Sequence, residues 1–268
     1  MPFFSVIIPV FNREKLIEET LCSVFNQTCK DYEIIVVDDG STDNTLTVLS
    51  RFSKDITVLH QQNGGPGLAR NKGIEQATGQ YVAFLDSDDR WFPWTLDIYK
   101  QVIDRTQAAF ISGTAFDFGQ PSDLKVVRPE TLKVEVFSDY LSTHKQFLRG
   151  LPSTSALKAK LLRASGGFTP QRINVEDSDL WLKLGVAEGF VGIRAPYVSG
   201  YRRHEQSEIA NDQKTFEGVL HFISQESNAR YPGGERRAKE RREIITRHVR
   251  PVSLTCLRQG KIRDAWRL

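Results

Sequence analysis

Four short apolar segments recur in the first third of this chain, and each is followed by a stretch that suits a helix or a turn. The segments are 4–10, 32–37, 56–60 and 81–85, and they are rich in β-branched residues. Because they are mostly continuous apolar runs instead of alternating with polar residues, they are typical of strands buried on both faces of a parallel sheet. Such strands alternating with helices predict an α/β fold, with a mostly parallel central sheet flanked by helices.

The segments between the strands predict the rest of the architecture. We expect helices over 13–26, with Asn12 as its cap, from 42 or 43 to 52, and from the glycine-rich loop 64–67 to Ala77. Beyond residue 110 the alternation stops. There we expect strands over 108–118 and 153–157, a helix over 139–149 after a loop, a turn at 166–168, a helix over 180–187, one or two strands within 191–201, and helices from 213 onward.

Polar side chains follow three of the predicted strands at the point where each strand ends. They are Asn12, the run 38–41 (Asp-Asp-Gly-Ser) and the run 86–89 (Asp-Ser-Asp-Asp). In open parallel sheets, ligands bind beyond the carboxyl ends of the strands. We therefore expect these three clusters to converge on one edge of the sheet and to form a binding site there.

The run 86–89 holds three carboxylates within four residues, directly after a buried strand. Carboxylates this close repel one another unless a cation or hydrogen-bond donors neutralise them. Mg²⁺ and similar hard cations are commonly held by one or two carboxylates together with substrate phosphates. The alternative is a turn in which an aspartate caps the next helix. The position at a strand end favours the metal and diphosphate interpretation, and leaves Asp89 as the helix cap.

The three cysteines, Cys22, Cys29 and Cys256, match neither a metal-binding spacing nor a disulfide framework, which suits a reducing compartment. No apolar run approaches the roughly 20 residues of a membrane-spanning helix. The N-terminus has no signal-peptide pattern. These features predict a cytoplasmic protein.

The net charge of +3 hides an uneven distribution. Residues 230–268 hold twelve Lys or Arg and four Asp or Glu, a local balance of +8, so the remaining 229 residues carry −5. Basic C-terminal helices bind anionic membranes or nucleic acid, and a solvated helical face is the alternative. We expect no nucleic acid, and treat peripheral contact with the inner face of a membrane as an open interpretation.

Taken in order, these motifs resemble the family 2 glycosyltransferases, whose GT-A fold binds nucleotide-sugars. The resemblance covers about residues 3–205 and rests on the segments 5–12, 35–43, 63–73, 86–88, 166–168 and 176–181. It implies a nucleotide-sugar-binding half over 1–107 and an acceptor-binding, catalytic half over 108–206 of the same domain. A basic helical extension then occupies 207–268.

The resemblance also implies which residues bind the donor. Asp39 would contact the nucleobase, Arg70 the diphosphate, and Asp86 with Ser87 the ribose or the sugar. Pro9, Phe11 and Asn12 would form a wall of the nucleotide pocket. The family usually has Tyr at the position of Phe11, so a hydroxyl contact is missing there, although stacking on a base does not need it. Each of these residues also has a purely structural alternative as a turn, cap, core or surface residue.

For the chemistry, the resemblance implies that Asp88, with His204, holds Mn²⁺ or Mg²⁺. Asp177 would be the general base that accepts the acceptor's proton, and Glu176 would bind the acceptor. Asp179 or Glu176 as the base, and a simple N-terminal cap cluster, remain alternatives.

The resemblance therefore implies an inverting, metal-dependent enzyme that transfers one sugar, from a UDP-linked donor in our prediction, to a hydroxyl of a glycan or lipid-linked acceptor. The Gln-X-X-Arg-Trp motif of processive synthases is absent. A nucleotidyltransferase or a dinucleotide-dependent oxidoreductase is disfavoured because the turn after the first strand lacks their glycine-rich loops. A catalytically silent nucleotide-sugar-binding or scaffold protein remains the alternative.

Overall fold

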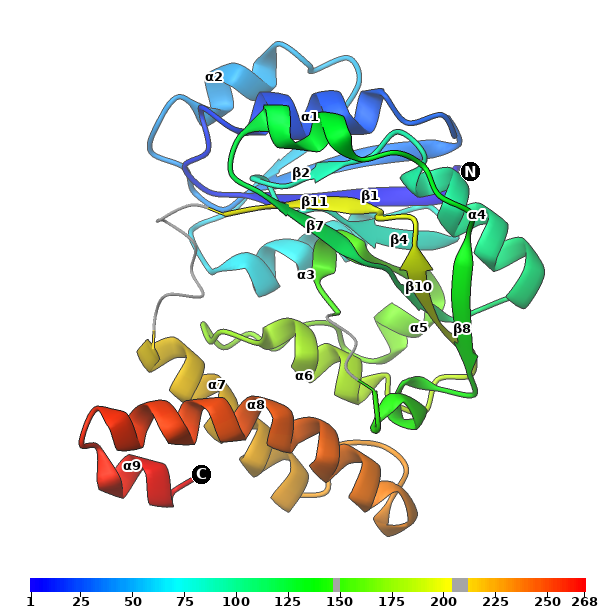
Figure 1. Ribbon diagram of the computed structural model, residues 1–268. Helices are drawn as coiled ribbons and strands as arrows, with labels where there is room; N and C mark the ends of the chain where they lie inside the picture. The colour runs from blue at the N-terminus through cyan, green and yellow to red at the C-terminus, as the bar shows by residue number, and fades with distance from the viewer. Residues whose placement is uncertain (147–149, 204–211) are drawn as a thin grey trace.

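The computed structural model describes residues 1–146, 150–203 and 212–268, and it confirms the α/β prediction (Figure 1). In this described part, eight strands form one sheet in the order β3-β2-β1-β4-β9-β6-β10-β8. Its first four strands are parallel and match the four apolar segments. They are β1 (Phe4–Val10), β2 (Tyr32–Asp38), β3 (Thr57–His60) and β4 (Tyr81–Phe84).

The second half of the sheet is mixed. β9 (Ser155–Lys158) lies antiparallel between β4 and β6 (Phe110–Ser112), and β10 (Phe190–Ala195) joins β6 to β8 (Lys133–Phe137). A smaller sheet contains β5 (Arg90–Trp91), β11 (Ser199–Arg202) and β7 (Ala115–Phe118). The single strand expected over 108–118 is therefore two strands in different sheets. β8 lies where a loop was expected.

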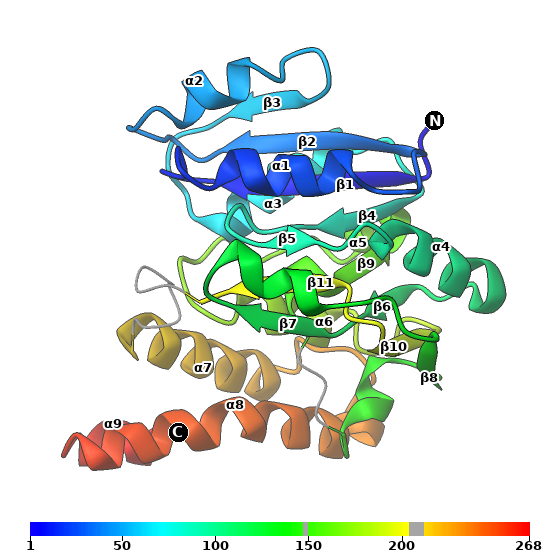
Figure 2. The same cartoon turned by 45° about the horizontal axis from the view of Figure 1, so that its top comes forward.

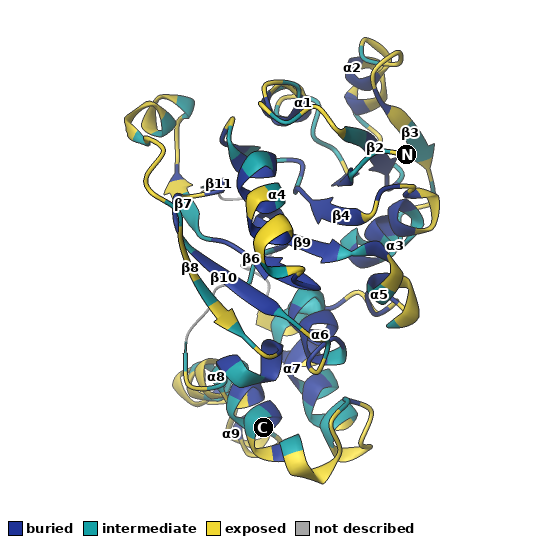
Figure 3. Ribbon diagram, turned by 90° about the vertical axis from the view of Figure 1, so that its right-hand side faces the viewer, coloured by how far each residue is buried: buried dark blue, intermediate teal, exposed yellow. Residues whose placement is uncertain are grey.

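Helices cover both faces of the large sheet (Figure 2). α1 (Ile17–Phe25), α2 (Thr45–Ser50) and α4 (Thr95–Thr106) share one buried apolar cluster, whereas α3 (Pro66–Gln76), α5 (Ala159–Ala164) and α6 (Glu176–Lys183) share the other. Along β1, Val6 and Ile8 belong to the first cluster and Ile7 to the second. Burial of both faces explains why these positions of the strand are apolar. In Figure 3 the neighbouring strand β4 is likewise drawn in the colour of buried residues.

Four short 3₁₀ helices occur in the described residues: η1 (Pro121–Val126), η2 (Tyr140–Thr143), η3 (Pro152–Thr154) and η5 (Glu235–Arg237). η2 replaces most of the longer helix expected over 139–149, of which residues 147–149 lie outside the described part. The side chain of Asp139 accepts a hydrogen bond from the Ser142 amide and so caps this turn. Pro152 opens η3, where the expected strand begins only at Ser155.

The C-terminal extension contains α7 (Asp212–Ser227), α8 (Ala238–Arg258) and α9 (Ile262–Trp266). Phe222, Ile244 and Ile245 join the same apolar cluster as α3 and α6. Arg237 binds Asp139 at 2.7 Å and so connects the extension to η2, while Arg241 binds Glu226 at 2.7 Å and joins α8 to α7. None of the helices that the structure describes combines the length and apolarity that crossing a bilayer requires.

The first helix begins later than predicted. Asn12 has a left-handed backbone with φ +50° and does not cap α1, which begins at Ile17. The reason is that the intervening amides bind the loop after β2 and the start of α2: the Arg13 amide donates to Thr45 Oγ1 and the Glu14 amide to Asp43 Oδ2. Conversely, α6 begins earlier than the predicted residue 180, so Glu176 lies within its first turn.

Candidate functional site

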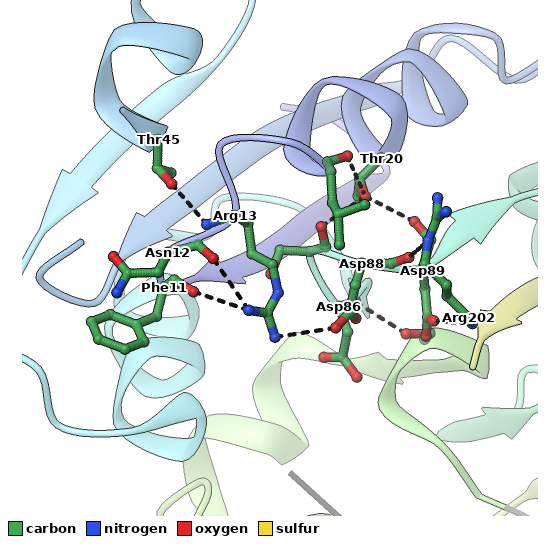
Figure 4. A network of polar contacts seen from close by, with 12 residues as sticks. Phe11, Asn12, Arg13, Thr20, Thr45, Asp86, Asp88, Asp89 and Arg202 are labelled. Carbon is green, nitrogen blue, oxygen red and sulfur yellow. Dashed lines mark hydrogen bonds and ion pairs between the residues drawn. The ribbon is translucent and has the colours of Figure 1, made fainter. Parts of the chain in front are cut away.

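The three polar clusters meet at one edge of the sheet, as predicted. β1 lies between β2 and β4, so the direction of the chain connections changes there and leaves room beyond the strand ends. The Asn12 amide donates to Ser41 Oγ at 3.0 Å, and its side-chain oxygen accepts from the Thr42 amide at 2.8 Å. Arg13, the next residue, pairs with Asp88 (Figure 4).

Asp39 is buried and fixes the loop that precedes α3. Its carboxylate accepts hydrogen bonds from Gln61 Nε2 and from the amides of Gly64 and Gly65, each at 2.7 Å. A contact with the nucleobase stays a prediction. Two residues predicted for the same pocket differ in exposure: Pro9 is buried in β1, while Phe11 is 41% exposed just beyond the strand. An exposed ring in this place is available for stacking.

Arg70 projects from α3 and connects two carboxylates from different parts of the chain. Its Nη2 lies 2.7 Å from Asp86 Oδ1, and its Nη1 lies 2.8 Å from Glu176 Oε1. The guanidinium is almost fully buried, and its carbon Cζ lies 5.1 Å from the centre of the Phe168 ring. The arrangement brings together the predicted donor residues and the predicted acceptor residue. Contact between Arg70 and a diphosphate remains a prediction.

The acidic run after β4 divides into the half-buried Asp86 and Asp88 and the buried Ser87 and Asp89. Asp88 is 3.3 Å from the Arg13 guanidinium, and the Ser87 carbonyl accepts a hydrogen bond from Thr20. Asp89 was expected to cap a helix, and this is wrong, since α4 begins only at Thr95. Its buried carboxyl instead accepts from the Arg202 amide, 113 positions away. Burial, together with the nearby Asp88 and Asp86, raises the pKa of Asp89 well above its usual value.

The residues at this edge fit a divalent cation only in part. Among residues 1–146, 150–203 and 212–268, no group of three or more His, Cys, Asp or Glu is arranged to hold a metal. His204, the other predicted ligand, lies outside the described residues. Asp86 and Asp88 nevertheless offer two carboxylates at a strand end, which is the donor set of a cation completed by substrate phosphates.

Asp177 and Glu176 lie in the first turn of α6. Val175, directly before them, has φ +66°, an uncommon backbone for a β-branched residue, and such strain tends to occur at functional sites. Asp177 is half-buried and accepts a hydrogen bond from the Ser178 amide at 2.6 Å. Burial and the neighbouring Glu176 carboxylate raise the pKa of Asp177 to about 7. A carboxylate with this pKa suits proton transfer near neutral pH.

Asp179, the alternative base, is completely buried and occupied by structural contacts. It pairs with Lys183 at 2.7 Å and accepts hydrogen bonds from Tyr231 at 2.8 Å and His221 at 3.2 Å. These partners come from α6 itself, from α7 and from the loop after α7. Asp179 therefore joins α6 to the C-terminal extension, and the geometry favours Asp177 for contact with an acceptor.

Sequence reasoning missed three side chains of the site, namely Arg13, Phe168 and Arg202. Arg13 directly follows Asn12 at the end of the first strand, so its position in the sequence could have predicted that it lies at this edge of the sheet. Arg202 donates from Nε to the Asp88 carbonyl and from Nη2 to Glu19. Nothing in the local sequence indicates this pairing, because the partners lie more than a hundred positions away along the chain.

Comparison with known proteins gives a consistent result. The model of the glycosyl transferase family 2 matches residues 5–164. An uncharacterized glycosyltransferase of Rickettsia conorii is 44% identical over 195 residues, which are 70% of this chain and 31% of that protein. A GalNAc(5)-diNAcBac-PP-undecaprenol beta-1,3-glucosyltransferase of Campylobacter jejuni is 43% identical over 106 residues, 38% of this chain and 34% of that protein.

Among solved structures, residues 1–349 of S. aureus TarS superpose with a TM-score of 0.70 and 25% identity, covering 92% of this chain and 72% of that one. The chain spans about a third of the length of the curated Rickettsia relatives that it matches.

Proposed function

The chain belongs to glycosyltransferase family 2, and from that premise we propose that it transfers a single sugar from a UDP-linked donor to a hydroxyl of a glycan or lipid-linked acceptor, with inversion. The observation that carries this proposal is the meeting of two carboxylates, from distant parts of the chain, at one arginine. Arg70 holds Asp86 at the end of β4 and Glu176 at the start of α6. This contact supports placing the proposed donor side and the proposed acceptor side in one site.

On the donor side, Asp39, Pro9, Phe11 and Asn12 surround the nucleotide, and Arg70, Asp86 and Ser87 face the diphosphate and the sugar. Asp88, with His204 as a further ligand, would hold Mn²⁺ or Mg²⁺ together with diphosphate oxygens, and Asp86 would contact the ribose or the sugar. When bound, such a cation stabilises negative charge on the leaving nucleoside diphosphate. The family membership and the strand-end carboxylates support this assignment.

On the acceptor side, Asp177 accepts the proton of the attacking hydroxyl. The hydroxyl oxygen forms a bond to the anomeric carbon while the bond from that carbon to the diphosphate oxygen breaks. A single displacement of this kind inverts the configuration. Glu176, held by Arg70, orients the acceptor beside the base. The pKa of about 7 supports the role of Asp177, because half of the carboxyl groups are then ionised at neutral pH.

We extend the proposal to the location of the acceptor. The relative from Campylobacter carries an undecaprenol-linked acceptor in its name, and a lipid-linked acceptor would bring this protein to the cytoplasmic face of a membrane. The end of the C-terminal extension suits such contact. Its exposed apolar side chains, with Trp266 84% exposed, are Leu254, Leu257, Ile262 and Trp266. Exposed basic residues lie among them, and apolar and basic groups together favour an anionic lipid surface.

The membrane part is tested by sedimentation with phosphatidylglycerol vesicles. We expect binding at low salt that weakens at high salt, and weaker binding of a Leu257→Ala, Trp266→Ala variant. Binding that is equal on phosphatidylcholine vesicles, or absent at low salt, contradicts this part and leaves the transfer activity unaffected.

The central proposal is tested in two steps. First, UDP, GDP, CMP and dTDP sugars are screened for thermal stabilisation with Mn²⁺ present, since a ligand stabilises according to its occupancy. Second, release of free nucleoside diphosphate is measured after a lipid-linked glycan extract is added. Stabilisation by a UDP-sugar followed by acceptor-dependent UDP release is the expected result. Stabilisation without release favours the catalytically silent binding protein, and no stabilisation by any donor contradicts both.

A further inference from the structure

The side chain of Arg13 already places a positive charge at the predicted diphosphate site. Its Nη2 lies 3.3 Å from Asp88 Oδ2, and its Nη1 donates to the Asn12 carbonyl at 3.2 Å (Figure 4). The side chain is 19% exposed. Within the described residues, its Nε is buried and makes no hydrogen bond. The guanidinium therefore has donors left over beside the carboxylate proposed to hold the cation.

The loop around Arg13 is held firmly in this position. The Arg13 amide donates to Thr45 Oγ1 at 2.8 Å, and the preceding Asn12 is fixed by Ser41 and Thr42. These contacts come from the loop and helix that follow β2, whereas Asp88 follows β4. Several hydrogen bonds therefore position Arg13 so that its side chain extends across the strand ends toward the acidic run.

The position of Arg13 affects how a cation can bind at Asp88, because both acidic residues at the site already have a positively charged partner. Asp86 is paired with Arg70, and Asp88 is paired with Arg13. A divalent cation that binds Asp88 without a nucleotide must compete with the guanidinium and then lie beside it. Two like charges at contact distance repel strongly even in a polar environment. A diphosphate changes the balance, because it supplies negative oxygens for both the cation and the guanidinium.

We propose that Arg13 is a built-in counter-ion of the donor site, which makes cation binding depend on the nucleoside diphosphate. Without a donor, Arg13 neutralises Asp88 and keeps the cation affinity low. With a donor bound, the guanidinium turns to the diphosphate, and its ion pair with Asp88 no longer opposes the cation. This inference rests on the proposed function, because it assigns a diphosphate to this edge of the sheet.

The test measures binding and needs no acceptor or turnover. Mn²⁺ is titrated into the protein without nucleotide, and free Mn²⁺ is followed by its electron paramagnetic resonance signal. We expect Arg13→Gln to bind Mn²⁺ at least about tenfold more tightly than the unmodified protein. Arg13→Lys, which keeps the charge, should stay close to the unmodified protein. In a second titration with EDTA present, Arg13→Gln should bind UDP more weakly.

Arg51→Gln is the matched control, because Arg51 forms an exposed ion pair with Glu18 away from the acidic run. Circular dichroism and melting temperature establish that each variant is folded. Mn²⁺ affinity that is unchanged or lower in Arg13→Gln overturns the proposal, as does a gain of equal size in Arg13→Lys or Arg51→Gln. Failure of the unmodified protein to bind any nucleoside diphosphate counts against the proposed function instead, and the titration with Mn²⁺ alone still decides the role of Arg13.

Discussion

Arg70 and Glu176 are 106 positions apart in the chain, yet Nη1 of the arginine lies 2.8 Å from Oε1 of the glutamate. The same guanidinium binds Asp86 at 2.7 Å. Both contacts are made by a side chain that is only 4% exposed. One buried cation therefore sets the distance between the end of β4 and the start of α6. The geometry between donor and base in the proposed reaction depends on it.

Replacing Arg70 by methionine should lower the stability of the protein, because it leaves two carboxylates without their shared partner. Removal of one member of a buried ion pair typically lowers the free energy of unfolding by about 3 kcal/mol. We expect a loss of this size in urea unfolding. Arg203→Met is the control, since Arg203 pairs with Asp117 at the surface and should lose less than about 1 kcal/mol. Equal losses in the two variants would contradict a bridging role for Arg70.

Asp177→Asn should abolish most of the transfer activity, because an amide cannot accept the proton of the acceptor hydroxyl. We expect kcat to fall by about a thousandfold, the usual contribution of a positioned base. The affinity for UDP, measured by calorimetry, should change less than about threefold, since a missing base affects the transition state and not ground-state binding of the donor. Asp179→Asn should mainly lower stability. Near-normal turnover of Asp177→Asn would refute the assignment.

The raised pKa of Asp177 predicts a specific pH dependence. Burial and the Glu176 carboxylate raise this pKa to about 7, and the base acts only when ionised. The rate of transfer should therefore rise with pH up to about 7 and then level off. Glu176→Gln removes a neighbouring negative charge, so the inflection should move to lower pH. An inflection that stays in place in Glu176→Gln would argue against coupling of the two carboxyls.

The same shift has an opposite effect on stability. A carboxyl whose pKa is higher in the folded state than in the unfolded state binds its proton more tightly when folded. Its contribution to stability is full below the unfolded pKa, near 4, and is lost as the pH rises through about 7. Urea unfolding of Asp177→Asn should accordingly depend less on pH between 4 and 8 than that of the unmodified protein. Parallel pH profiles would contradict this.

The strands and the converging clusters were predictable, whereas the partners of individual site residues were not. β1 to β4 followed from apolar runs that both faces of the sheet bury, and the parallel strand direction then placed Asn12 and Asp86, which follow β1 and β4, at the same edge of the sheet. The start of α1 was misplaced because the amide of Arg13 binds Thr45, 32 positions away. Asp89 was misassigned as a cap for a similar reason, since its partner is the distant Arg202. Local patterns carry no signal for such long-range contacts.

Gly166 and Gly167 offer a matched pair for testing the loop beneath Arg70. Both have left-handed backbones, with φ of +78° and +70°. A methyl group on Gly167 would lie 2.3 Å from Asn71 Oδ1, whereas one on Gly166 meets nothing within 4 Å. Asn71 binds both the amide and the carbonyl of Phe168. Gly166→Ala should therefore lower the free energy of unfolding by about 1 kcal/mol, because alanine is strained in the left-handed backbone conformation. Gly167→Ala should lower the free energy of unfolding by at least about 2 kcal/mol more, because the hydrogen bonds between Asn71 and Phe168 are disturbed as well. Equal losses in thermal unfolding would contradict the clash.

The C-terminal extension should stabilise α6, the helix that bears the proposed base, and Tyr231 provides the test. Burial alone would raise the pKa of Asp179, but hydrogen bonds from His221, Lys183 and Tyr231 outweigh it and keep the pKa below its usual value. A hydrogen bond to a charged group contributes about 2 kcal/mol. Tyr231→Phe should lose about that much in urea unfolding at pH 7, whereas Tyr197→Phe, at an exposed position, should lose little.

The sign of the pH effect separates this contact from simple packing. A carboxyl with a lowered folded pKa stabilises the protein above its unfolded pKa, and this contribution is lost as the pH falls through the folded pKa. The difference between Tyr231→Phe and the unmodified protein should therefore shrink as the pH drops below about 4. A loss of stability caused by packing would instead be the same at every pH, because it does not depend on the charge of Asp179. If the difference in the free energy of unfolding stays constant with pH, Tyr231 stabilises the protein by packing alone and not through the charge of Asp179.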